Sequence, residues 1–135
     1  MPTALIVASH RDDRERMGTW IEGAGFEVES CPGPIGPDAC LGLRGPRCPL
    51  AGAADVIVLD MGGHDDPFGG VVSAWELMNA YLSQGLPVVA LAHPGDTLLA
   101  EGSAALMIRR PPERDELVDA IRRALRGRAR VGPGF

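Results

Sequence analysis

The residue best placed to do chemistry is Asp60, which ends the most apolar short run of the chain, Val56–Leu59. A carboxylate can accept a phosphoryl group or bind a metal ion. Open α/β sheets place their reactive groups at the carboxyl ends of buried parallel strands. This position therefore makes Asp60 the first site candidate. The alternative is that its side chain caps the tight turn that follows, Met61–Gly63.

Histidines supply the next candidates. His10 follows the first apolar run, where it could donate a proton or contact a phosphate; the alternative is a solvent-facing residue at the start of a helix. A metal site of imidazole and carboxylate ligands is a further possibility at this edge of the sheet. Its candidate ligands are Asp60, His64, Asp65, Asp66 and His93. Loops at such edges are often polar without any ligand, so this reading stays an alternative.

The three cysteines are Cys31, Cys40 and Cys48. A zinc or iron–sulfur site would need a fourth ligand, and no Cys-x-x-Cys pair is present. The simpler reading is that they are small buried hydrophobic residues that fasten an irregular loop to the core. We expect reduced thiols, since nothing in the sequence indicates secretion.

The composition is that of one globular domain. The chain has 135 residues, is 45% hydrophobic and 23% charged, and carries a formal charge of −5. The sequence shows no apolar run long enough to span a membrane, and its N-terminus does not have the pattern of a signal peptide. Together with the negative charge, this predicts a cytoplasmic protein that binds neither membrane nor nucleic acid. All 13 basic residues are arginine, which excludes Schiff-base chemistry and a P-loop lysine.

Short apolar runs alternate with amphipathic segments along the chain. Periodicity predicts strands at 4–8, 26–29, 55–60, 87–92 and 104–108 and helices around 17–24, 74–82, 94–102 and 117–125. Ser9 to Asp12 has the form of a helix capping box. The segment 31–52 is too rich in Pro and Gly for a long helix, so we expect a loop there that carries a partner contact.

This alternation predicts an α/β fold of the flavodoxin-like kind, a three-layer sandwich around a five-stranded parallel sheet of order 2-1-3-4-5. The switch point of such a sheet lies between its first and third strands. The residues expected to line that cleft are Ala8, Ser9, His10, Asp60 and Met61.

Four motifs in order resemble response-regulator receiver domains, the chemotaxis-type phosphoacceptor fold, over roughly residues 3–126. Leu-Ile-Val, an Arg-bearing helix and Gly25-Phe26-Glu27-Val28 resemble the receiver opening, and Ala54 to Met61 resembles the strand that ends in the phosphorylated aspartate. Leu86 to Leu91 resembles the fourth strand. Arg110-Pro111 resembles the Lys-Pro turn before the last helix. In place of the second receiver helix the chain has its Pro/Gly/Cys-rich loop.

The resemblance implies that Asp60 is the phosphoacceptor and that two acids after the first strand hold Mg²⁺ with it. Those positions are Ala8 and Ser9, which carry no carboxylate. Asp12 and Asp13 are acidic but are expected a turn inside the helix, where only a shifted register would bring them to the site. No cofactor is therefore expected, because one aspartate, a carbonyl and a hydroxyl hold Mg²⁺ poorly.

Other positions of the receiver pattern also differ. The hydroxyl residue that ends the fourth strand in receivers is Ala92 here, and the aromatic switch residue aligns with Leu106. The phosphate-binding lysine is replaced by Arg109 or Arg110, with the register open by one residue. The candidate phosphate contacts are Ser9, His10, Arg109 and Arg110.

These residues predict a stand-alone pseudo-receiver in two-component or phosphorelay signalling, not an enzyme, which acts by protein–protein interaction. The expected partners are a histidine kinase or a downstream regulator. A homodimer is plausible through the last helix, the fifth strand and the helix 94–102. The alternatives are a working receiver phosphorylated on Asp60 with unusual helpers, and a small nucleotide- or metal-binding module. Residues 127–135 are expected to form a flexible tail after the domain 1–126.

Overall fold

A computed structural model gives the structure of the chain and describes residues 1–31, 53–61, 74–92, 105–109 and 111–130. The parallel strands are β1 (Thr3–Val7), β2 (Glu27–Cys31), β3 (Val56–Asp60), β4 (Val88–Ala92) and β5 (Leu106–Arg109). The helices are α1 (Arg11–Gly23), α4 (Ala74–Ser83) and α5 (Arg114–Arg130).

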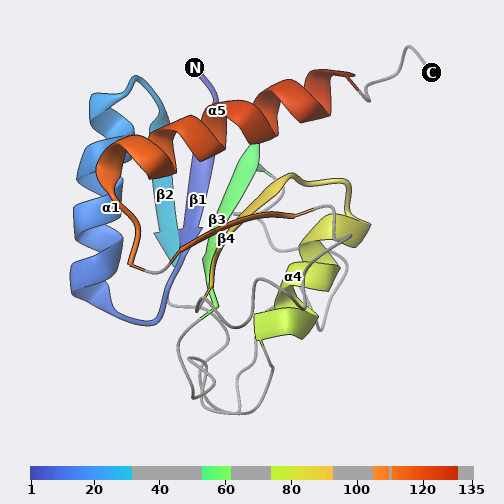
Figure 1. Cartoon of the computed structure of the whole chain (residues 1–135), viewed down its shortest axis with the longest axis horizontal. Helices are drawn as coiled ribbons and strands as arrows, with labels where there is room; N and C mark the ends of the chain where they lie inside the picture. Colours follow the sequence, from blue (N-terminus) through green and yellow to red (C-terminus); the bar gives the residue numbers. More distant parts are fainter. Residues whose placement is uncertain (32–52, 62–73, 93–104, 110, 131–135) are drawn as a thin grey trace.

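The five strands form one parallel sheet of order β2-β1-β3-β4-β5, as the sequence predicts (Figure 1). In the register of the sheet, Val7 pairs with Leu59 and Asp60 pairs with Leu91. Because all five strands run the same way, their carboxyl ends meet at one edge of the sheet. The last residue of β3, Asp60, therefore lies beside the end of β1.

A pair of hydrogen bonds fixes β1 against β3 at the opposite edge of the sheet. The backbone N–H of Asp55 donates to the carbonyl of Thr3 at 2.8 Å. The backbone N–H of Thr3 donates in return to the Asp55 carboxylate, also at 2.8 Å. This reciprocal contact sets the register that brings Asp60 level with the end of β1.

The burial of the strands explains their residue types. Every residue of β3 and β4 is buried, as is expected for central strands that are covered on both faces. In contrast, β2 is largely exposed and lies at the edge of the sheet, where polar residues are tolerated. The predicted edge position of this strand is confirmed.

Helices cover both faces of the sheet and make the three layers that the sequence predicts. On one face, α1 and α5 contribute Met17, Ile21, Leu117 and Ile121 to a core that includes the side chains of β1 and β3. On the other face, α4 contributes Leu77, Met78 and Tyr81. Each such large side chain, fully buried, stabilises the fold by roughly 1.5–3 kcal/mol relative to an exposed one.

Two local predictions need correction. The N-cap of α1 is His10 and not Ser9, and His10 makes no side-chain capping bond, so the predicted capping box does not form. The last helix runs from Arg114 to Arg130, beyond the expected helical residues 117–125 at both ends. The domain boundary and the flexibility of 127–135 stay predictions. The proposed loop 31–52, apart from Cys31, and the helix 94–102 lie outside the described residues.

Two glycines, one within α1 and one just after it, should respond to alanine in opposite ways. Gly18 lies inside the helix, and an added methyl group would make ordinary contacts of 3.6 Å with Val28 and 3.8 Å with Ile6. Gly25 has φ +98°, a conformation that L-residues rarely adopt. We expect Gly18→Ala to raise the free energy of unfolding by about 0.5–1 kcal/mol and Gly25→Ala to lower it by about 1–2 kcal/mol. Urea unfolding measures both; destabilisation by Gly18→Ala would contradict the packing described here.

Candidate functional site

Asp60 is the buried charged residue of the described core, with 2% of its surface exposed. Its strand neighbour Met61 donates a backbone hydrogen bond to the carbonyl of Leu91 at 2.9 Å, so the backbone stays in the sheet past the site. Side chains alternate between the two faces of a strand. Since Val56 and Val58 belong to the core under α1 and α5, Asp60 faces the same layer.

A cavity of about 130 Å³ opens at this position. It lies between the first turns of α1, the ends of β3 and β4, and the segment before α5. Its lining residues are Asp13, Arg16, Met17, Asp60, Leu91, Pro111 and Pro112. The space suffices for several water molecules or one group of phosphoryl size. Asp60 therefore has a place where a small ligand could reach its carboxylate.

The positively charged side chain of Arg16 also lines the cavity. Arg16 donates from Nη2 to Oδ1 of Asp13 at 2.6 Å, and the side chains are 50% and 27% exposed. The guanidinium carbon of Arg16 also lies 5.8 Å from the centre of the Trp20 ring, within the range of a cation–π contact. Arg16 is thus held from two sides beside the cavity, and it neutralises the second carboxylate there.

A second arginine marks the end of β1. The Nη1 atom of Arg14 donates to the carbonyl oxygen of Ala8 at 2.7 Å. Ala8 itself is fully buried, and its N–H donates to the carbonyl of Cys31 at 3.2 Å. The guanidinium of Arg14 therefore lies at the carboxyl end of β1 on the side of β2, where it lines a groove together with Val28 and Ser30. It is not among the described residues that line the Asp60 cavity.

The structure places the predicted phosphate contacts around this edge without bringing them into the cavity. Ser9 is half-buried between β1 and α1, His10 is exposed at the N-cap of α1, and Arg109 is exposed at the end of β5. None of the three is among the described residues that line the Asp60 cavity. Arg110 lies outside the described residues. The roles of all four as phosphate contacts stay predictions.

Other candidate ligands fall largely outside the described residues. This applies to His64, Asp65, Asp66 and His93, and to Cys40 and Cys48. Within the described part of the chain, no three His, Cys, Asp or Glu residues are grouped so that they could hold a metal ion. The zinc, iron–sulfur and imidazole–carboxylate hypotheses stay untested.

The residues that sequence reasoning missed are Asp13 and Arg16. The expectation that Asp13 needs a shifted register to reach the site is wrong, because Asp13 lines the same cavity as Asp60. The signal was available in the helix pattern. Met17 was expected in the core. Asp13, four residues before it, shares its helix face, and Arg16, one residue before it, adjoins that face. Asp13 and Arg16 therefore lie above the end of β3.

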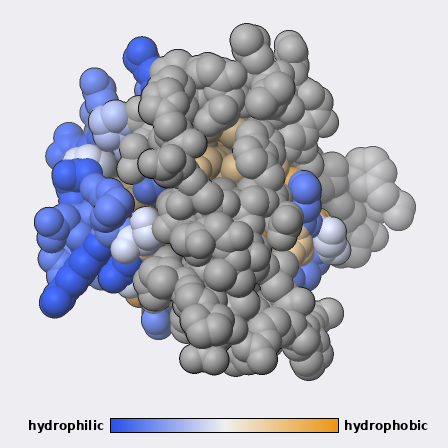
Figure 2. Space-filling view, turned by 90° about the horizontal axis from the view of Figure 1, so that it is seen from below, coloured by the Kyte–Doolittle hydropathy of each residue, from blue (hydrophilic) through white to orange (hydrophobic). Residues whose placement is uncertain are grey.

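Viewed from the carboxyl ends of the strands, the surface around α1 is hydrophilic, and hydrophobic residues are visible toward the middle of the molecule (Figure 2). This agrees with the charged exposed side chains of α1, such as Arg11 and Glu15, which form an ion pair at 2.9 Å. The approach to the Asp60 cavity along α1 is thus polar and carries both signs of charge. Among the described helices, none is both long and apolar enough to cross a membrane.

Comparison with known proteins gives structural relatives only. Neither a family profile nor a curated protein matches the sequence. A response regulator receiver domain from Clostridium thermocellum superposes with a TM-score of 0.71 at 18% identity, over 97% of this chain and 99% of that chain. The chemotaxis protein CheY4 of Vibrio cholerae gives 0.64 at 21% identity, over 93% and 99%. A CheY-like receiver domain protein from Methanospirillum hungatei gives 0.68 at 16% identity, over 98% and 99%.

These three structures superpose over nearly the full length of the chain, and at such low identities they show the fold alone. The parallel sheet of order 2-1-3-4-5 with flanking helices matches the flavodoxin-like fold of these receiver domains. The chain therefore has the fold of a response-regulator receiver domain.

Proposed function

We propose that this protein is a pseudo-receiver: it works in two-component signalling by binding other proteins, and it takes up phosphate on Asp60 weakly or not at all with Mg²⁺. The observation that carries the proposal is the set of residues at the end of β1. Ala8 and Ser9 offer no carboxylate there, and the acid that does line the Asp60 cavity, Asp13, is paired with Arg16 at 2.6 Å.

The physical reason lies in the needs of phosphoryl transfer. An aspartate that attacks a phosphorus atom needs positive charge against the transferring oxygens, which a bound metal ion usually supplies. Mg²⁺ requires several oxygen ligands in near-octahedral geometry. At the end of β1 no carboxylate is available, and the Asp13 carboxylate in the cavity is already paired with Arg16, whose positive charge disfavours a divalent ion there. Asp60 is left as a poor anchor for the metal.

The proposed partners are a histidine kinase or a downstream regulator, as receiver domains of this fold suggest. A receiver that does not depend on phosphate would bind such a partner through its resting surface. Cytoplasmic location and the absence of nucleic-acid binding belong to the same proposal.

Intact mass spectrometry after incubation with Mg²⁺ and acetyl phosphate tests the proposal. We expect the mass of the protein to stay unchanged under conditions in which a typical receiver domain, run alongside, gains one phosphoryl group. The Asp60→Asn variant is the matched control, because it keeps the shape of the side chain and removes the nucleophile. Rapid, stoichiometric gain of a phosphoryl group that Asp60→Asn abolishes would overturn the proposal.

One observation favours the working receiver as a second candidate. Asp13 and Asp60 line one cavity, so a cation that displaced Arg16 would meet two carboxylates. In that case the mass experiment gives phosphorylation that depends on both residues. Loss of the phosphoryl gain in Asp13→Asn as well as in Asp60→Asn would identify this mechanism.

A further inference from the structure

The outward face of α5 carries a line of four charged residues in the order acid, acid, base, base. They are Asp115, Asp119, Arg122 and Arg126, and all four are exposed. Their spacing of four, three and four residues places them on one side of a helix. The opposite side contains the buried Leu117 and Ile121. We call these four residues the α5 charge stripe.

The order of charges makes the stripe complementary to itself. Two such helices laid antiparallel across a two-fold axis bring Asp119 of one copy to Arg122 of the other. The same arrangement brings Asp115 to Arg126. A two-fold interface uses the same patch on both subunits, so each of these contacts occurs twice. In a parallel arrangement like charges would meet.

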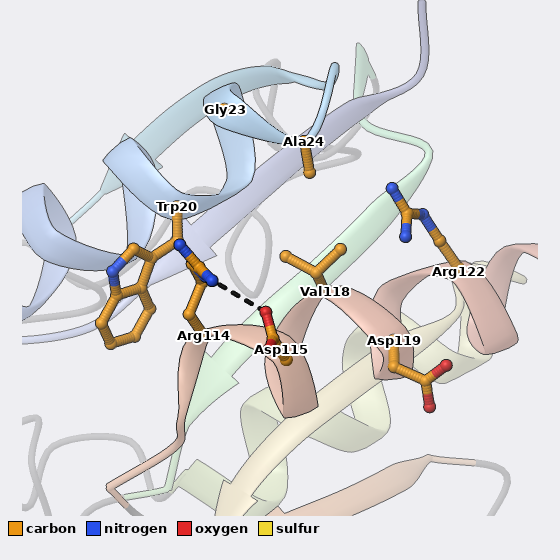
Figure 3. A pocket seen from close by; sticks show the side chains of 8 residues that line it. All are labelled: Trp20, Gly23, Ala24, Arg114, Asp115, Val118, Asp119 and Arg122. Carbon is orange, nitrogen blue, oxygen red and sulfur yellow. Dashed lines mark hydrogen bonds and ion pairs between the residues drawn. The ribbon is translucent and has the colours of Figure 1, made fainter.

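The stripe is exposed and borders a groove that both charged and apolar residues line. Helix α5 lies on the outside of the sheet (Figure 1). A groove of about 350 Å³ separates its first half from the end of α1. Figure 3 shows this groove, with Trp20 and Ala24 on the α1 side and Val118 between the charged residues of α5. A partner helix along the stripe would cover part of this groove.

The charges of the stripe are not committed to strong contacts within the chain. Asp115 pairs with Arg114 at 3.1 Å, but the two side chains are 89% and 65% exposed. Asp119 pairs with Arg123 at 3.8 Å, and these side chains are also more than half exposed. Exposed pairs of this kind contribute little. They would be exchanged at low cost for contacts with another molecule.

We propose that a second copy of this chain docks on the α5 charge stripe, so that the protein forms a weak, salt-sensitive homodimer through antiparallel α5 helices. This surface shares the last helix with the dimer face expected from the sequence, but it uses neither the fifth strand nor the segment 94–102. It does not depend on phosphorylation of Asp60. The dimer is weak because exposed ion pairs supply most of its contacts, and added salt screens them.

Sedimentation velocity over a range of protein concentrations at low salt tests the proposal. We expect a monomer–dimer equilibrium that shifts toward monomer when salt is raised to about 0.5 M. Asp119→Arg or Arg122→Asp alone turns both central contacts from attractive to repulsive. Each should weaken dimerisation roughly tenfold or more.

Two further samples make the outcome specific to this geometry. An equimolar mixture of the Asp119→Arg and Arg122→Asp variants should form a heterodimer, because each variant supplies the charge that the other now needs. The double variant D119R/R122D should also recover dimerisation. Misfolded variants would show neither recovery. The matched control Glu116→Arg changes the charge of the same helix outside the stripe and should dimerise like the unmodified protein.

Three results would overturn the proposal. The first is a protein that stays monomeric at low salt and high concentration. The second is a dimer that both single variants leave unchanged, which would place the interface elsewhere. The third is a pair of single variants whose mixture does not recover.

Discussion

Replacement of Ala8 and Ser9 by aspartate is expected to give this protein a magnesium site and, with it, phosphorylation of Asp60. The two new carboxylates would stand at the end of β1, beside the end of β3, where Val7 pairs with Leu59. Together with Asp60 they offer the oxygen ligands that Mg²⁺ needs. We expect the A8D/S9D variant to gain one phosphoryl group from acetyl phosphate in an intact-mass experiment.

The same variant should show the metal in its stability. Ala8 is fully buried, so a carboxylate there lies near Asp60 in a poorly solvated place, which costs several kcal/mol when no cation is present. Binding of Mg²⁺ to the folded state offsets that cost. We therefore expect a melting temperature that is low without metal and rises with Mg²⁺ concentration, whereas the unmodified protein shows little change.

Addition of Asp60→Asn to the A8D/S9D variant is the control, because it should abolish the phosphoryl gain. A variant that folds, binds Mg²⁺ and still fails to be phosphorylated would show that Ala92 or the arginines at the end of β5 limit the reaction. A variant whose stability ignores Mg²⁺ would contradict the proximity of the two strand ends as the basis of the site.

Ile121→Ala is expected to cause the largest loss of stability from a single conservative change. Ile121 is fully buried in the core that joins α1 and α5 to the sheet. Truncation of such a side chain removes its transfer free energy and leaves a cavity, at a cost of about 3 kcal/mol. For a domain with a total stability of about 5–15 kcal/mol, that loss lowers the melting temperature by roughly 10 °C.

Glu116→Ala is the matched control for this prediction, because Glu116 lies on the same helix, is exposed and is outside the α5 charge stripe. Its effect on the free energy of unfolding should stay within about 0.5 kcal/mol. Thermal unfolding by circular dichroism measures both variants. Equal stability of the two would mean that α5 does not pack on the sheet as described.

Much of the fold was predictable because the buried strands are unusually apolar. The run Val56–Leu59 identifies a central strand, and its position in the alternation of strands and helices places Asp60 at the carboxyl edge. The polar residues of 26–29 identify an edge strand. These features depend only on which residues are buried, and the pattern of apolar and polar residues in the sequence indicates that directly.

The local surroundings of Asp60 were harder to predict because they depend on which helix turn lies above the strand end. Asp13 reaches the cavity because α1 begins at Arg11 with His10 as its N-cap, and the expected cap at Ser9 obscured that start. Arg14 and Arg16 are ordinary helix residues in the sequence. Only the structure shows that they point to the Ala8 carbonyl and to Asp13.

The pairing of Arg16 with Asp13 in the Asp60 cavity has a consequence for how the proposed pseudo-receiver would carry information. A charge fixed to a helix by its own side chain cannot dissociate, so the pocket would be blind to fluctuations in cellular magnesium or in high-energy phosphate compounds. The amount of protein present would then be the variable that its partners sense. Control would pass to its synthesis and degradation, and changes in folding stability would translate directly into the strength of the output.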